Sequence, residues 1–271
     1  MNLTIPIGIF DSGVGGLSVL RALRQRLPGQ PAIFFADQAH VPYGPRPMEE
    51  VRDFAEGITR FLLEQGAGLI VVACNAASAA ALYHLRGKFP GVPFVGMEPA
   101  VKPAAETTRS GVVGVLATPA TFQGALYASV VERFAHDVTV LQDTCPGLVG
   151  QIEAGELDSP RTRQILERAL EPMLAKGIDT VVLGCTHYPF VIPLIEEIAG
   201  TGVRVIDPAP AVARQTERLL KQNGLLAEGD APAPVRFVTS GNPAGLQAML
   251  VRLGFGGWPV EQANWEGHQI K

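Results

Sequence analysis

The fold that this sequence predicts is indicated most clearly by the stretch Leu69-Ile70-Val71-Val72-Ala73-Cys74-Asn75-Ala76-Ala77-Ser78. It opens with a short apolar run rich in β-branched side chains, which is typical of a strand buried in a parallel sheet. A second stretch, Thr180-Val181-Val182-Leu183-Gly184-Cys185-Thr186-His187-Tyr188-Pro189, has the same layout. Ligands gather at the carboxyl ends of such strands. Each half of the chain therefore offers one thiol where chemistry is expected.

Strand and helix patterns alternate along the remainder of the chain. This rhythm predicts an α/β fold of two similar doubly wound parallel-sheet domains, with the active site in the cleft between them. We expect residues 1–97 and 208–255 to form the first domain, residues 98–207 the second, and residues 256–271 a poorly ordered tail. Strands are predicted at 6–10, 32–36, 69–73, 92–96, 111–116, 138–141, 180–184, 203–206 and 236–239, and helices at 17–27, 47–65, 78–89, 118–133, 160–176, 189–199, 211–222 and 243–253.

Composition narrows the class of protein. The chain has 271 residues, a net charge of −4 and no basic block, which argues against a nucleic-acid partner. Its apolar stretches are shorter than the ~20 residues of a membrane helix, so we expect no membrane span. Residues 1–6 lack the charged and apolar regions of a signal peptide. Three cysteines do not make a disulfide framework, and they predict reduced thiols in a cytoplasmic protein.

The thiols allow two interpretations. A free cysteine is often a buried packing residue. A cysteine before a helix can instead become a reactive thiolate, and His187, two residues after Cys185, could hold or supply a proton. Two cysteines at matching strand ends, each followed by polar residues, favour chemistry over packing. Cys145 lacks this context and is expected to be structural.

Polar residues follow other predicted strands. Asp11-Ser12-Gly13-Val14-Gly15-Gly16 could hold a carboxylate or an amine, and its spacing matches neither nucleotide-binding fingerprint. Val41-Pro42-Tyr43-Gly44 could hold an anion with backbone amides or be an ordinary turn. Thr118 could cap a helix and nothing more. We expect Glu153 to lie on a helix, where a glutamate side chain is usually exposed to solvent. Its position alone therefore does not predict a function for it.

Metal, protease and cofactor chemistry have little support. The five histidines are scattered, and Cys185-Thr186-His187 alone does not supply a tetrahedral ligand set, so we expect no metal ion. A cysteine protease would leave the second strand-end cysteine unexplained. No pyridoxal lysine motif is evident, and we expect no cofactor.

Four motifs taken in order resemble the glutamate racemases, members of the cofactor-independent aspartate/glutamate racemase superfamily. The resemblance extends from about residue 7 to residue 220. The motifs are Asp11-Ser12-Gly13-Val14-Gly15-Gly16-Leu17-Ser18, Pro42-Tyr43-Gly44, Ala73-Cys74-Asn75 and Gly184-Cys185-Thr186-His187-Tyr188-Pro189.

The resemblance implies a two-base mechanism that racemises glutamate and supplies D-glutamate for peptidoglycan synthesis. Cys74 matches the base that acts on D-glutamate, and Cys185 matches the base that acts on L-glutamate. Asp11 and His187 match assisting groups, one on each side, and Glu153 matches a further assisting acid. The family is commonly dimeric, so a homodimer is expected. The residues that match the substrate shell are Asp11, Ser12, Tyr43, Gly44, Asn75, Ala76, Thr118, Thr186 and His187.

One position departs from the family pattern. Residues 75–78 read Asn-Ala-Ala-Ser where the family has Asn-Thr-Ala-Ser, so Ala76 lacks a hydroxyl that would bond to the substrate. The departure keeps open a racemase for aspartate or another amino acid. A non-catalytic amino-acid-binding protein is a third possibility, although such a protein would need no proton donors on opposite faces of its ligand.

Overall fold

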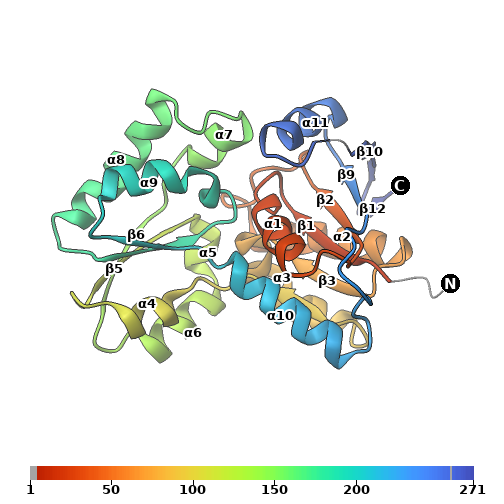
Figure 1. Cartoon of the computed structure of the whole chain (residues 1–271), viewed down its shortest axis with the longest axis horizontal. Coiled ribbons are helices and arrows are strands. Elements are labelled where there is room, and N and C mark those ends of the chain that lie inside the picture. Colours follow the sequence, from red (N-terminus) through yellow and green to blue (C-terminus); the bar gives the residue numbers. More distant parts are fainter. Residues whose placement is uncertain (1–4, 257) are drawn as a thin grey trace.

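Two separate parallel sheets form the frame of the molecule (Figure 1), and the computed structural model describes residues 5–256 and 258–271. Residues 1–4, part of the segment for which no signal peptide is predicted, lie outside the described residues. The larger sheet has the strand order β10-β9-β2-β1-β3-β4 and the smaller one β6-β5-β7-β8. The strands are β1 (Ile7–Asp11), β2 (Ala32–Ala36), β3 (Leu69–Val72), β4 (Phe94–Gly96), β5 (Val112–Ala117), β6 (Thr139–Asp143), β7 (Thr180–Gly184), β8 (Arg204–Ile206), β9 (Val235–Thr239) and β10 (Val260–Gln262).

The two sheets share one topology. The order β2-β1-β3-β4 in the larger sheet corresponds to β6-β5-β7-β8 in the smaller one. Cys74 closely follows β3 and Cys185 follows β7, so the two thiols occupy equivalent places in the two sheets. The predicted pair of similar parallel sheets is confirmed.

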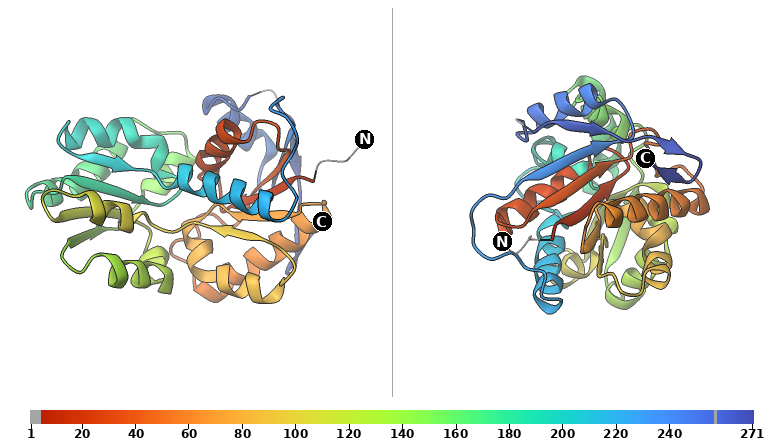
Figure 2. Two further views of the ribbon diagram at one scale, coloured as in Figure 1. Left: turned by 60° about the horizontal axis from the view of Figure 1, so that its bottom comes forward. Right: turned by 90° about the vertical axis from the view of Figure 1, so that its right-hand side faces the viewer.

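Helices cover both faces of each sheet (Figures 1 and 2). In the larger sheet, Ile9 and Phe34 pack toward one apolar cluster with α1 and α10, while Phe10 and Phe35 pack toward a second with α2 and α3. The first cluster continues beneath α8 and α9 of the smaller sheet. The helices are α1 (Leu17–Arg26), α2 (Met48–Glu64), α3 (Asn75–Lys88), α4 (Val101–Thr107), α5 (Pro119–Gln123), α6 (Ala125–Phe134), α7 (Leu148–Glu153), α8 (Pro160–Leu174), the 3₁₀ turn η1 (Tyr188–Val191), α9 (Ile192–Ala199), α10 (Ala209–Gln222) and α11 (Pro243–Arg252).

Some helices differ from the predicted ones. The single helix expected over 118–133 is divided into α5 and α6 by Gly124, which has an extended backbone. A Cβ atom at Gly124 would lie 2.6 Å from the Cβ of Ala79, so this glycine lets the chain pass close to α3. The helix after Cys74 begins at Asn75, three residues earlier than expected, and the expected helix over 189–199 begins as η1. The short helix α4 was not predicted, and α7 supplies the helix that was expected, without bounds, around Glu153.

The expectation of a poorly ordered tail over residues 256–271 is wrong for the strands that form there. Strand β10 extends the larger sheet beside β9, and β11 (Trp265–Glu266) pairs with β12 (Gln269–Ile270) as an antiparallel hairpin. Ala263 and Ile270 are buried in the apolar cluster that contains residues of α2. Burial of these apolar side chains holds the segment, despite its turn-rich composition. No helix of the described residues is long and apolar enough to cross a membrane.

Candidate active site

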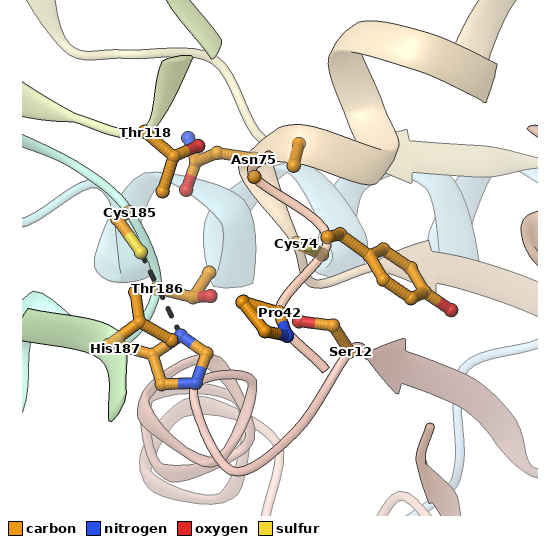
Figure 3. Close-up of a pocket in the computed structure, with 12 residues that line it drawn as sticks. Ser12, Pro42, Cys74, Asn75, Thr118, Cys185, Thr186 and His187 are labelled. Carbon is orange, nitrogen blue, oxygen red and sulfur yellow. Dashed lines mark hydrogen bonds between the residues drawn. The ribbon is translucent and has the colours of Figure 1, made fainter. Parts of the chain in front are cut away.

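Both strand-end cysteines line one small cavity between the two sheets (Figure 3), with an empty volume of about 280 Å³. The structure thus brings together the motifs that the sequence singled out. Asp11 and Glu153 lie just behind the cavity wall, and Val149 of α7 joins the lining without having been predicted. Pro42 was part of a quoted motif but had no assigned role. The lining residues are Ser12, Pro42, Tyr43, Gly44, Cys74, Asn75, Ala76, Thr118, Val149, Cys185, Thr186 and His187.

On the side of Cys185, an imidazole joins the thiol to a carboxylate. The Cys185 sulfur lies 3.7 Å from His187 Nδ1, and His187 Nε2 lies 2.6 Å from Glu153 Oε1 (Figure 3 draws the first contact). Burial disfavours the imidazolium, yet the bonds with Cys185 and Glu153 raise the pKa of His187 well above its usual value. A protonated His187 can donate to the sulfur and to the carboxylate together.

Glu153 is an interior residue of the site rather than a solvated one. Its Oε1 accepts the N–H of Val14 at 2.7 Å, and its side chain is only 14% exposed. Burial disfavours the charge on Glu153, but the bond and charge of His187, with the N–H of Val14, hold the pKa of this carboxyl below its usual value. A Cβ at Gly13 would lie 1.9 Å from Oε1, so only glycine allows this approach.

On the side of Cys74, burial controls the thiol. Cys74 is the N-cap residue of α3, and it was expected to gain thiolate character from the helix. Burial and the negative charge of Asp11 instead raise the pKa of the Cys74 thiol far above its ordinary value. The N–H groups of Ala77 and Ser12 act in the opposite direction and are outweighed. Cys74 therefore keeps its proton when the site is empty.

Hydrogen bonds across the cleft hold the two domains together at the cavity. Asp11 is fully buried, and its Oδ2 accepts the hydroxyl of Thr186 at 2.8 Å. Ser18 donates to the carbonyl of Thr186 at 2.9 Å, and the bond from Val14 to Glu153 joins the same two domains. Burial raises the pKa of Asp11 despite the bonds that its carboxylate accepts. These contacts position the groups behind both thiols.

Polar groups without partners face the cavity from its lining. Both the Nδ2 and the Oδ1 of Asn75 are buried with no hydrogen-bond partner among the described residues. A buried amide without partners is unusual in a native protein, and it points to a polar ligand. The hydroxyl of Thr118 caps no backbone N–H and lies 3.3 Å from that of Thr121. This hydrogen bond uses only part of the capacity of the Thr118 hydroxyl, which can also bond to a ligand.

The loop after β2 closes another part of the cavity. A Cβ at Gly44 would lie 2.7 Å from the Cβ of Thr118, and the Gly44 carbonyl accepts the N–H of Ala120 at 3.2 Å. Glycine at position 44 thus lets this loop meet the second domain. Among residues 5–256 and 258–271, no group of three or more His, Cys, Asp or Glu side chains is arranged to hold a metal ion.

Comparison with known proteins places this cavity in a family context. The family model described as Asp/Glu/Hydantoin racemase matches residues 16–216. The glutamate racemase of Pseudomonas paraeruginosa is 55% identical over 245 residues, which cover 90% of this chain and 92% of that protein. The crystal structure of the glutamate racemase RacE1 from Bacillus anthracis superimposes with a TM-score of 0.85 at 31% identity, covering 98% of each chain. The Escherichia coli glutamate racemase in complex with L-glutamate and the activator UDP-MurNAc-Ala gives a TM-score of 0.84 at 33% identity, covering 97% of this chain and all of that one.

Proposed function

Because the chain belongs to the glutamate racemases of the Asp/Glu/hydantoin racemase family, we propose that it interconverts L- and D-glutamate by proton transfer at Cys74 and Cys185. One observation carries this proposal: the two thiols come from equivalent strands of two similar sheets and line the same cavity. A substrate in that cavity has one thiol available to each face of its α-carbon.

In the direction from L- to D-glutamate, the sulfur of Cys185 acts as the base. As a thiolate it takes the α-proton, so that the C–H bond breaks and an S–H bond forms. The thiol of Cys74 gives its proton to the opposite face, forming the new C–H bond and leaving a thiolate at Cys74. Burial and the charge of Asp11 raise the pKa of Cys74, so this thiol carries the proton that the donor in this direction needs. The reverse direction exchanges the two roles.

Groups behind the thiols assist each transfer. His187 can donate to the Cys185 sulfur, and Glu153 supports the imidazolium. Asp11 stands on the side of Cys74, where its charge favours the protonated thiol. A substrate that fills this cavity displaces water from it, which strengthens these interactions around the carbanionic transition state.

The substrate is held by the polar lining. We assign the amide of Asn75 to the amino acid, because it has no partner within the described protein. Hydroxyl and backbone groups complete the shell, and Ala76 contributes an N–H without a hydroxyl. The remaining members of the proposed shell are Asp11, Ser12, Tyr43, Gly44, Thr118, Thr186 and His187.

Three broader properties belong to the same proposal. We take residues 1–97 with 208–255 and residues 98–207 as the two domains. We expect a homodimer, which sedimentation analysis would detect. We also expect the protein to be located in the cytoplasm, where its three free thiols stay reduced. Its product would supply peptidoglycan synthesis.

Hydrogen exchange tests the proposed reaction. The protein is incubated in D₂O with L-glutamate, D-glutamate, L-aspartate or D-aspartate, and α-deuterium and optical rotation are followed. We expect deuterium incorporation and loss of optical rotation from both glutamate enantiomers. Turnover of aspartate alone would identify a sister racemase, and the absence of exchange from all four would favour a binding protein.

A further inference from the structure

The C-terminal hairpin makes a polar contact with Asp37, which in turn bonds to Tyr43 in the loop that lines the cavity. We propose that Trp265 is a positioning residue: its indole N–H, acting through Asp37, fixes Tyr43 and with it the loop 42–44 that lines the cavity. Trp265 lies beyond residues 16–216, which the family model matches. The inference rests on the proposed function and adds a substrate-positioning element to it.

Asp37 is the centre of this arrangement. It follows β2, is fully buried, and has four polar partners from three parts of the chain. Its Oδ2 accepts the hydroxyl of Tyr43 at 2.5 Å, and its Oδ1 accepts the indole N–H of Trp265 at 2.8 Å. Ser240 donates to Oδ1 at 2.6 Å, and His40 Nδ1 lies 3.0 Å from Oδ2. A buried carboxylate needs such donors, and loss of one displaces the others.

Tyr43 transmits this order to the cavity. It is 1% exposed and lines the cavity, while its hydroxyl is bound to Asp37. Its carbonyl accepts the N–H of Arg46 at 3.0 Å, and the carbonyl of the next residue, Gly44, bonds to Ala120 of the second domain. The ring is therefore the anchor of a loop whose backbone reaches across the cleft. A shift of the Tyr43 ring moves the groups that we assign to substrate binding.

A glycine inside α2 is explained by the hairpin. Gly57 lies in the middle of the helix, where glycine is unfavourable. A Cβ at this position would lie 2.7 Å from Cζ3 of Trp265 and 2.8 Å from the carbonyl oxygen of His268. The rigid indole ring also packs against Phe54, with ring centroids 5.7 Å apart. The close seat of Trp265 on α2 therefore depends on glycine at position 57.

Trp265→Phe isolates the polar contact, because it keeps an aromatic ring and removes the N–H. We expect the KM for L- and D-glutamate to rise about three- to tenfold, with kcat within twofold, and the melting temperature to fall because the smaller ring packs less tightly on α2. A purely structural role would change the melting temperature and leave the KM alone. The matched control is Trp258→Phe in the same segment, since Trp258 is 39% exposed; it should keep the wild-type KM and kcat.

Two further variants test the route through Tyr43. The double variant Tyr43→Phe with Trp265→Phe should have the KM of Tyr43→Phe alone, because both changes disable one contact chain. Gly57→Ala, which displaces the hairpin without touching the cavity, should raise the KM as Trp265→Phe does. Multiplicative effects in the double variant, or a wild-type KM in Trp265→Phe, would overturn the inference. A wild-type protein without glutamate turnover would instead overturn the proposed function.

Discussion

The Nε2 atom of His187 lies 2.6 Å from Oε1 of Glu153, and the same oxygen accepts the N–H of Val14 from the opposite domain. One carboxylate oxygen thus supports the imidazolium beside Cys185 and also ties the two domains together. The protonation of His187 and the closure of the cleft are coupled at a single atom. Replacing Glu153 by glutamine removes the negative charge but keeps an oxygen that can accept from Val14. One substitution therefore tests the effect on His187 apart from the contact between the domains.

Glu153→Gln should shift the pH dependence of turnover. The amide oxygen can still accept from Val14, but the negative charge that raises the pKa of His187 is gone. A histidine with a lower pKa loses its proton at a lower pH, so the alkaline limb of kcat/KM for L-glutamate should move down by about one unit or more. Rates measured between pH 6 and 10 check this. Glu156→Gln, at an exposed position nearby, serves as the control, and an unmoved limb in Glu153→Gln would remove Glu153 from the relay.

Replacement of either active-site thiol should block racemisation. Cys74→Ser and Cys185→Ser each remove one proton carrier, and a hydroxyl is far less acidic than a thiol, so we expect turnover to fall by at least ~10²-fold in each. Circular dichroism of the glutamate pool measures the rate.

Cys145→Ser is the matched control for the thiol substitutions. Cys145 is buried, lies outside the cavity lining, and should be replaceable with turnover within about twofold of wild type. Wild-type turnover in either active-site variant would refute the two-base assignment.

The place of Cys74 and Cys185 at the ends of strands could be predicted from the sequence, because each place depends only on the short apolar run before the cysteine. The β-branched residues before Cys74 and Cys185 specify buried parallel strands, and equivalent places in two similar sheets bring their ends together. Ser12, Tyr43 and Thr186 were named because their motifs resemble those of the family, and all three line the cavity.

Contacts between distant segments could not be predicted in this way. Val149 lies on a helix of only six residues, too short to show a clear period in the sequence, and this helix packs on α8 and η1. Trp265 and Asp37 are 228 residues apart, and no local period encodes their bond. The expected thiolate character of Cys74 fails for a related reason: its burial and the charge of Asp11, which depend on the folded chain, raise its pKa more than nearby N–H groups lower it.

Asp179→Asn should destabilise the protein in a pH-dependent way. Asp179 accepts the N–H groups of Arg109 at 2.5 Å and Ser110 at 2.9 Å and the hydroxyl of Thr108 at 2.8 Å. Partial burial disfavours its charge, but these bonds lower the pKa of Asp179 to about 2. An unfolded aspartate has a pKa of about 3.9. The stabilisation is therefore full above about pH 5 and is lost as the pH falls toward 2.

Urea unfolding at two pH values measures this effect. At pH 7 we expect Asp179→Asn to lower the free energy of unfolding by about 1–2 kcal/mol, because charge-assisted bonds are lost. At pH 3.5 the difference from wild type should be smaller. Asp137→Asn, at an exposed position, should have little effect at either pH. A deficit of equal size at both pH values would show that the charge of Asp179 is not the cause.

Ala76→Thr should lower the KM for glutamate. Ala76 is 4% exposed, lines the cavity, and adjoins the unpartnered amide of Asn75, so a hydroxyl there would face the proposed substrate shell. A hydrogen bond to a charged group contributes roughly 1.5–3 kcal/mol, which corresponds to a KM about tenfold lower or better. Ala76→Val has nearly the same shape without the hydroxyl, and steady-state kinetics of the two variants separate the hydroxyl from the added volume. An equal fall of the KM in both would assign the effect to packing, and an unchanged or higher KM in Ala76→Thr would mean that this protein binds glutamate without a donor at position 76.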